Sequence, residues 1–133
     1  MVVDSSAILA ILLAEADRER VTNLILEAET RAISAANVLE IGIVLESRRG
    51  EAAGREFDLF LNQASIEIVP VDAEQVEIAR LAWRRYGKGR HPAGLNFGDC
   101  FAYALAKVLD EPLLAKGTDF PLTDIPCVRI AER

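Results

Sequence analysis

Cysteine and histidine are scarce in this sequence, which has two cysteines and one histidine among its 133 residues. Cys100 and Cys127 do not form a paired metal-ligand spacing, and the single histidine adds no second ligand, so no zinc site is indicated. Two isolated cysteines also give no sign of a disulfide framework. We expect both to be buried free thiols.

Long hydrophobic runs are also missing. The most apolar stretch, residues 7–14, is far shorter than the roughly 20 residues that a membrane-spanning helix needs. Asp4 precedes it where a signal peptide would carry lysine or arginine. We therefore expect a cytoplasmic protein that makes no use of a membrane.

Positive charge is in deficit, because the formal net charge is −6. This argues at first against a nucleic-acid partner. Four basic residues, however, lie within seven positions: Arg84, Arg85, Lys88 and Arg90. Without these four, the formal net charge of the rest of the chain is −10. A basic spot on an acidic body can bind a polyanion locally. The alternative is a solvated helix end, where cations are favourable. Both readings of this basic cluster stay open.

What the sequence does contain is typical of a folded soluble domain, with 51% hydrophobic and 27% charged residues. A chain of this length can bury a core of its own and is too short for two domains. We expect one domain over residues 1–133.

The chain is organised around its first seven residues. Val2 and Val3 form a short apolar strand that ends at Asp4, and a helical pattern begins directly afterwards. Such strands are typical of the buried centre of a parallel sheet, where ligands bind at the carboxyl ends of the strands. Asp4 would then lie at the floor of a cleft. The alternative is that Asp4 only caps the following helix.

Hydrophobic periodicity predicts short strands alternating with single or paired helices. Strands are expected at 2–3, 31–34, 66–71 and 112–115, with a weaker fifth candidate at 127–130. Helices are expected at 5–15, 17–29, 35–49, 51–64, 72–86 and from 96 onward. In the helix over 72–86 we expect Val76, Ala79, Leu81, Ala82 and Trp83 to face inward. The series predicts a three-layer α/β/α domain with a mostly parallel central sheet.

Two acidic residues lie in predicted helices where their positions call for an explanation. Glu40 is embedded among apolar neighbours, which is costly for a carboxylate unless it reaches water or a cation. Asp99 follows Asn96 by three residues, the spacing of a capping box. That reading leaves Gly98 unexplained, since glycine weakens a first helical turn. A residue without a side chain there favours close approach by another group.

A fourth acid, Asp119, follows the predicted strand 112–115, where a turn carboxylate is the simple alternative. Parallel topology brings Asp4, Glu40, Asp99 and Asp119 toward one edge of the sheet. Carboxylates held together repel one another, and a cation is needed to keep all of them ionised. Oxygen ligands alone indicate a hard ion, Mg²⁺ or Mn²⁺, of the kind that serves phosphate chemistry.

Several segments together resemble the PIN-domain family, and within it the VapC toxins of bacterial toxin–antitoxin pairs. They are Val-Asp-Ser-Ser-Ala at the start, Glu40 in its helix, Asn-Phe-Gly-Asp-Cys-Phe-Ala-Tyr-Ala-Leu-Ala-Lys from 96 and Leu-Leu-Ala-Lys-Gly-Thr-Asp-Phe from 113. The resemblance covers nearly the whole chain. It implies a Mg²⁺-dependent endoribonuclease that cuts RNA, is held inactive by a cognate antitoxin and forms a homodimer.

Carried over by position, Asp4 and Asp99 match the family's principal metal ligands. Glu40 matches the third acid, and Asp119 matches a fourth that varies among members. Nearby polar residues are expected to orient water or a carboxylate: Ser5, Ser6, Asn96 and Thr118. The basic cluster is expected to line the RNA approach, and the third and fourth predicted helices offer apolar surface for a dimer.

Two other function classes compete with this reading. A receiver-like signalling domain has a similar length and an acidic Mg²⁺ pocket, but it would need an adjacent acidic pair before the first helix, which this chain lacks. The other is a PIN-like domain without nuclease activity that only binds RNA or a protein partner. A test of metal-dependent cleavage on a structured RNA separates the three.

Overall fold

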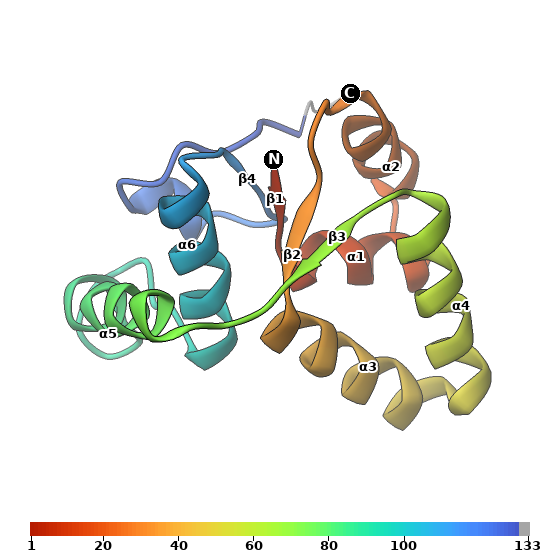
Figure 1. Cartoon of the computed structure of the whole chain (residues 1–133), viewed down its shortest axis with the longest axis horizontal. Coiled ribbons are helices and arrows are strands. Elements are labelled where there is room, and N and C mark those ends of the chain that lie inside the picture. The colour runs from red at the N-terminus through yellow and green to blue at the C-terminus, as the bar shows by residue number, and fades with distance from the viewer. Residues whose placement is uncertain (131–133) are drawn as a thin grey trace.

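The computed structural model describes residues 1–130 of the chain, and its centre is a four-stranded sheet (Figure 1). The strand order is β3-β2-β1-β4, and every pair is parallel. The strands are β1 (Val2–Val3), β2 (Ala32–Ser34), β3 (Glu67–Val69) and β4 (Leu113–Leu114). The first strand of the chain thus lies inside the sheet, between β2 and β4, as its apolar sequence predicts.

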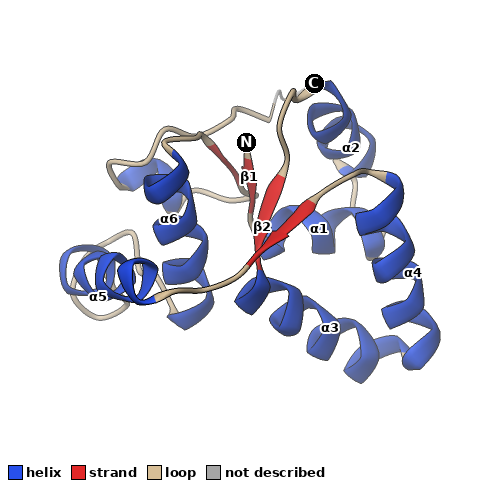
Figure 2. Ribbon diagram, in the orientation of Figure 1, coloured by secondary structure: helices blue, strands red, loops and turns tan. Residues whose placement is uncertain are grey.

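Six helices cover the sheet on both faces (Figure 2). They are α1 (Ser5–Leu12), α2 (Arg18–Glu27), α3 (Ala35–Arg49), α4 (Glu51–Gln63), α5 (Ala73–Tyr86) and α6 (Phe97–Leu109). Helices α5 and α6 lie on one side and α1 to α4 on the other, which confirms the three-layer α/β/α architecture. None of the helices in the described residues is long and apolar enough to cross a membrane.

Alternation along the strands creates two separate hydrophobic cores. Val2 and Leu113 are buried in the core under α5 and α6, whereas Val3 and Leu114 are buried in the core under α1 to α4. Successive side chains of a strand point to opposite faces, so two apolar residues in a row serve both cores. This is why such short strands can be apolar throughout.

Polar caps set the ends of several helices where the sequence places them. Ser34 ends β2 and accepts a hydrogen bond from the Ala36 N–H to start α3. Asp72 accepts one from the Gln75 N–H, 2.9 Å away, to start α5. Gly50 separates α3 from α4 with a φ of +81°, a value that favours glycine. These predicted boundaries are confirmed.

The weaker strand candidate at 127–130 does not form a strand. Cys127 makes a single parallel bridge with Leu113, through hydrogen bonds from Leu113 to Pro126 and from Val128 to Leu113. Cys127 is exposed, so the expectation that both cysteines are buried is wrong for this one and confirmed for Cys100. The segment around Cys127 lies beside β4 and makes only one bridge, so it leaves this side chain exposed to solvent.

The predicted inward face of α5 is confirmed for Ala79 and Ala82 and wrong for its larger apolar residues. Val76, Leu81 and Trp83 are about half exposed. The residues that pack inward are mostly small or polar: Gln75, Ala79, Ala82 and Tyr86. Because small side chains allow close approach of two helices, α5 packs tightly on α6 through its alanines and leaves its larger apolar residues outside.

Candidate functional site

Asp4 lies where β1 ends and α1 begins. Its side chain accepts hydrogen bonds from the Ser6 N–H at 3.0 Å and from the Ser6 hydroxyl at 2.6 Å. It is only 4% exposed, and burial raises the pKa of its carboxyl, with a further contribution from the charge of Glu40. Asp4 is therefore a helix cap and a buried acid at the strand end at once.

Asp99 starts α6 in a complete capping box. Its N–H donates to Asn96 Oδ1 at 2.9 Å, and its carboxylate accepts from the Asn96 N–H at 3.0 Å. Burial raises the pKa of Asp99 to about 6, and the charges of Asp4, Asp119 and Glu40 add to the rise. The capping alternative is thus correct, and the other three acids are near enough for their charges to act on Asp99.

Glu40 is fixed by one polar partner from α1 and one from its own helix, α3. The Ser5 hydroxyl donates to Glu40 Oε1 at 2.5 Å, and the Asn37 amide donates to the same oxygen at 3.2 Å. Asn37 also donates to the Gly98 carbonyl at 3.0 Å, which ties α3 to the start of α6. The sequence reasoning missed Asn37, although its place three residues before Glu40 in an apolar helix was a usable signal.

Gly98 allows this close contact between α3 and α6. A Cβ atom at position 98 would lie 2.1 Å from Glu40 Oε2, closer than any non-bonded contact. The prediction that a residue without a side chain permits close approach here is confirmed, and the approaching group is the Glu40 carboxylate.

The loop after β4 brings the fourth acid. Asp119 and Thr118 are both exposed, and Asp119 is close enough to contribute to the raised pKa of Asp99. The same loop is joined to the first acid, because the Lys116 N–H donates to the Ser6 hydroxyl oxygen at 2.9 Å. No hydrogen bond ties Thr118 to an acid within the described residues, so its orienting role stays a prediction.

The basic cluster lies at the end of α5 and in the loop beyond it. Arg84 and Arg85 occupy the last helical turn, which agrees with the helix-end reading. The Arg90 guanidinium lies 4.7 Å from the centre of the Trp83 ring, and its Nε donates to the Arg84 carbonyl. Arg84 and Phe97 line one groove of about 470 Å³, and Phe97 directly precedes Gly98. Arg84 therefore shares a groove with the first residue of α6, and the role of the cluster in RNA binding stays a prediction.

The donor set suits a hard cation. Its ligands would be carboxylate oxygens, and no lysine or arginine forms an ion pair with Asp4, Glu40 or Asp99 in residues 1–130. Among residues 1–130, no three acidic, thiol or imidazole side chains are placed so that they could hold a metal ion together. Mg²⁺ keeps several waters and binds proteins through one or two carboxylates, so a smaller set of these acids still suits it. Burial is the main cause of the raised pKa values of Asp4 and Asp99, and the charges of neighbouring acids add to the rise.

Comparison with known proteins places this geometry in context. The family model described as PIN domain matches residues 1–126. A protein named Ribonuclease VapC from Mycolicibacterium smegmatis is 56% identical over 128 residues, covering 96% of this chain and 99% of that protein. Ribonuclease VapC30 from Mycobacterium tuberculosis is 50% identical over 130 residues, covering 98% and 99%.

Solved structures share the fold at low sequence identity. Mycobacterium tuberculosis VapC20, described as a sarcin-ricin loop cleaving toxin, has a TM-score of 0.78 at 19% identity, over 96% of this chain and 98% of that one. A toxin–antitoxin complex from Klebsiella pneumoniae has a TM-score of 0.72 at 16% identity, over 99% and 98%. These likenesses concern the arrangement of helices and strands.

Proposed function

The chain belongs to the PIN-domain family, as a VapC-type member, and on this premise we propose that it is a Mg²⁺-dependent endoribonuclease toxin neutralised by a cognate antitoxin. The observation that carries the proposal is the contact that holds the Glu40 carboxylate against Gly98, directly before Asp99. Burial raises the pKa of Asp99 to about 6, and the charges of Asp4, Asp119 and Glu40 add to the rise. Four acids whose charges act on one point, without a cationic side chain among them, are suited to hold an ion. Relatives named as ribonucleases support RNA as the substrate.

In this proposal Asp4, Glu40 and Asp99 hold Mg²⁺, which would supply an activated water and offset charge on the cleaved phosphodiester. The chain's own contribution is to fix the carboxylates. Ser5 donates to Glu40 and Ser6 donates twice to Asp4, so neither acid can rotate freely. Mn²⁺ has the same preference for oxygen ligands and is expected to replace Mg²⁺.

Cleavage of a structured RNA with Mg²⁺, with Mn²⁺ and with excess chelator tests this function. We expect cleavage with either metal and none with chelator. The Glu40→Gln variant should lose most of the activity while keeping its helical circular dichroism. Binding of RNA without any cleavage would instead support the alternative, a PIN-like binding module without nuclease activity. Cleavage that persists in chelator would contradict the metal dependence.

We propose that the basic cluster guides RNA to the acids. Phosphate contacts depend on salt and little on sequence, and each contact to a single strand adds about 0.7 to the slope of log affinity against log salt. Replacing Arg85, Lys88 and Arg90 by glutamine should weaken RNA binding and flatten that slope. The control variant replaces Arg48 and Arg49, which lie in the last turn of α3 just as Arg84 and Arg85 lie in the last turn of α5. If the slope of log affinity against log salt is equal in both variants, the alternative that the cluster is only a solvated helix end is favoured.

The antitoxin in this proposal blocks the same acids. A guanidinium can bond a carboxylate through two parallel contacts, and a chain with net charge −6 attracts a basic peptide. An antitoxin arginine that occupies the metal position would compete with Mg²⁺ for Asp4, Glu40 and Asp99. Raising Mg²⁺ through its binding range should then weaken inhibition. Inhibition that does not respond to Mg²⁺ would favour steric blocking of the RNA path.

We also propose a homodimer, as the family resemblance implies. The outward side of α3 carries Leu39 and Ile43, which are 66% and 57% exposed, beside Phe97, which is 82% exposed. Apolar side chains gathered in this way favour burial against another copy. Sedimentation of wild type and of Leu39→Asp should give a dimer and a monomer, respectively. A wild-type monomer over the whole accessible concentration range would contradict the dimer.

A further inference from the structure

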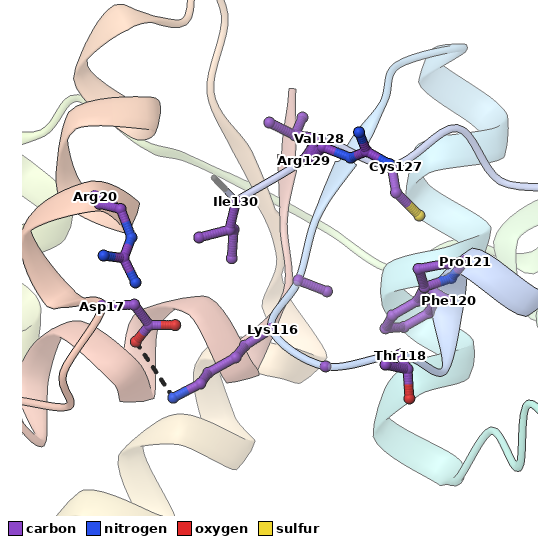
Figure 3. A pocket seen from close by; sticks show the side chains of 12 residues that line it. Asp17, Arg20, Lys116, Thr118, Phe120, Pro121, Cys127, Val128, Arg129 and Ile130 are labelled. Atoms are coloured by element: carbon purple, nitrogen blue, oxygen red, sulfur yellow. Dashed lines mark ion pairs between the residues drawn. The ribbon is translucent and has the colours of Figure 1, made fainter. Parts of the chain in front are cut away.

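A few buried side-chain atoms have no hydrogen-bond partner within residues 1–130, and each of them weakens the fold. They are Asp17 Oδ1, Arg20 Nε, Asn37 Oδ1 and Gln75 Oε1. Asp17 and Arg20 line a recess of about 570 Å³, where Asp17 already forms an ion pair with Lys116 Nζ at 3.2 Å (Figure 3). Asn37 differs from the others because its amide contacts Glu40, one of the four acids of the candidate site.

Asn37 is completely buried in α3, one turn before Glu40. Its amide nitrogen, Nδ2, donates to Glu40 Oε1 at 3.2 Å and to the Gly98 carbonyl at 3.0 Å. Its oxygen, Oδ1, is buried and accepts no hydrogen bond from residues 1–130. Turning the amide over would place Oδ1 against two acceptors, so the partners fix the orientation of the group. The nitrogen is thus used twice and the oxygen is not used.

Folding stability alone does not account for an asparagine at this position. A buried acceptor without a donor raises the free energy of the folded chain. Glu40 Oε1 has a second donor in the Ser5 hydroxyl, and the Gly98 carbonyl lies within the backbone hydrogen-bond ladder of α6. An apolar side chain at position 37 would therefore leave neither partner without a hydrogen bond, and it would remove the unpaired oxygen.

The two carboxylate oxygens of Glu40 have different surroundings. Oε1 accepts from both Ser5 and Asn37. Oε2 accepts no hydrogen bond from residues 1–130, and it is the atom that a Cβ at position 98 would meet. The oxygen that stays free for an ion is thus the one next to Gly98, directly before Asp99.

The Asn37 amide also connects the two helices that carry these acids. One planar group contacts Glu40 of α3 and the Gly98 carbonyl of α6, so it couples the position of the carboxylate to the start of α6. Mg²⁺ demands nearly ideal ligand geometry. Carboxylates from two helices can meet that demand only when the helices are held at a fixed separation.

We propose that Asn37 is a positioning residue for the metal ion. It holds Glu40 through Oε1, which keeps Oε2 beside the start of α6, and it does so at a cost to folding stability. The proposal rests on the metal binding that belongs to the ribonuclease function proposed above. Asn37 touches neither the ion nor the RNA and acts through Glu40. Groups that hydrogen-bond a metal ligand in this way change metal affinity or activity by about 10- to 100-fold.

Metal binding by Asn37→Leu, measured without RNA, tests the proposal. Leucine has the branched shape of asparagine and donates no hydrogen bond. The Kd for Mn²⁺, obtained from the electron paramagnetic resonance signal of the free ion, should rise at least about tenfold. Asn37→Ala, which leaves space where leucine fills it, should raise the Kd as well. Wild-type affinity in these variants, with circular dichroism showing that they are folded, would overturn the proposal.

Gln75 provides the matched control. It is only 3% exposed, its amide nitrogen donates to the Pro70 carbonyl at 2.9 Å, and its Oε1 is buried without a partner. Gln75→Met removes a buried amide of the same kind from α5, which carries none of the four acids. This variant should keep the wild-type Kd for Mn²⁺. An equal loss of affinity in Gln75→Met and Asn37→Leu would show a general effect of folding and would overturn the proposal.

A double-mutant cycle determines whether Asn37 acts through Glu40. In a Glu40→Ala protein the amide has no carboxylate to hold, so adding Asn37→Leu should change the Kd for Mn²⁺ by less than about twofold. The same tenfold loss in both backgrounds would mean that the two residues act independently, and the proposed route through Glu40 would be wrong.

Cleavage measurements separate failure of this proposal from failure of the ribonuclease function. In a protein that cuts RNA, the Mg²⁺ concentration for half-maximal cleavage should rise in Asn37→Leu by the same factor as the Kd, and it should not change in Gln75→Met. A wild type that binds Mn²⁺ and loses affinity on Asn37→Leu, but cuts no RNA, would support the role of Asn37 and refute the ribonuclease function. A wild type that cuts RNA while its metal affinity is independent of Asn37 would overturn the role of Asn37 alone. Absence of Mn²⁺ binding by wild type would overturn both that role and the metal dependence.

Discussion

Two groups of acidic residues flank the loop after β4, and they are compensated in opposite ways. In one group, Asp99 has a pKa raised to about 6 by burial and by the neighbouring acids. In the other, Glu15 and Asp17 both pair with Lys116, whose own pKa is raised by these partners. The acids of the Asp99 group thus keep uncompensated charge, whereas Glu15 and Asp17 are neutralised by Lys116.

This difference indicates which acids the fold completes by itself. A lysine that bonds Glu15 and lies 3.2 Å from Asp17 makes the second group part of the structure of the folded chain. The first group raises the free energy of the metal-free protein, because burial disfavours the ionised forms of Asp4 and Asp99 and the charges of neighbouring acids add to this cost. A group of acids that weakens folding and lies at one edge of the sheet is suited to bind an ion from solution. The substitutions below test that contrast.

The largest effect is expected from Asp99→Asn. Asparagine keeps an oxygen that can accept the Asn96 N–H, so the capping box survives while one carboxylate is lost. Mg²⁺-dependent RNA cleavage should fall by about two orders of magnitude or more, because the site loses a ligand and its share of transition-state charge stabilisation. Initial rates with saturating RNA and a Mg²⁺ titration measure the loss. Cleavage at the wild-type rate would remove Asp99 from the ligand set.

A smaller loss of activity is expected from Gly98→Ala. The added methyl group would overlap Glu40 Oε2, so the carboxylate must leave its position and its bond from Ser5. Cleavage should fall by about tenfold or more, since small displacements of catalytic groups are costly. Gly42→Ala is the matched control, because a Cβ there lies 3.8 Å from the nearest atom. It should keep activity and raise stability by about 0.5–1 kcal/mol.

Features that depend on local sequence could be predicted before the structure. The central strand, the caps at Ser34 and Asp72 and the break at Gly50 follow from residue types over a few positions. The inward face of α5 could be predicted only in part. Ala79 and Ala82 pack inward as expected, whereas the larger apolar residues do not. Hydrophobicity alone predicts that both sets face inward, and the close packing on α6 decides between them.

The same division holds for the candidate site. Asp4 and Asp99 were expected at one edge of the sheet because parallel strands share their carboxyl ends, and their roles as ligands stay a prediction. Asn37 was missed because its second partner, the Gly98 carbonyl, lies on a helix 61 residues further along the chain. The cavity lined by Asp17, Lys116 and Val128 is formed by three segments far apart in sequence, so no spacing along the chain indicates it.

Stability should respond in opposite directions in the two acidic groups. Asp99→Asn should raise the stability of the metal-free protein at neutral pH by about 1–2 kcal/mol, after discounting the two-unit pKa rise for partial exposure. A carboxyl with a raised pKa in the folded state binds protons more tightly than in the unfolded chain. Its folding contribution is therefore lost as pH increases from about 4 to about 6.

Urea unfolding in chelator from pH 4 to pH 7 measures this effect. Wild type should lose stability across that window relative to Asp99→Asn, and the difference should level off above it. Addition of Mg²⁺ should reverse the order at neutral pH, since an ion that binds only the folded state stabilises it. Equal stability of the two proteins at every pH would show that the acids do not repel one another in the folded chain.

The smallest effect is expected in the compensated group, from Lys116→Met. Methionine retains the aliphatic length of lysine and leaves Glu15 and Asp17 without their cation. The free energy of unfolding should fall by about 1 kcal/mol, toward the upper end for exposed ion pairs, because Asp17 is largely buried. Lys88→Met, at an exposed lysine that forms no ion pair in residues 1–130, should stay within about 0.5 kcal/mol of wild type. The Lys116 effect should also shrink as salt is added, because the pair is partly open to solvent. A Lys116→Met protein as stable as wild type, or more stable, would mean that this group carries uncompensated charge like the first, and the contrast between the two groups would fail.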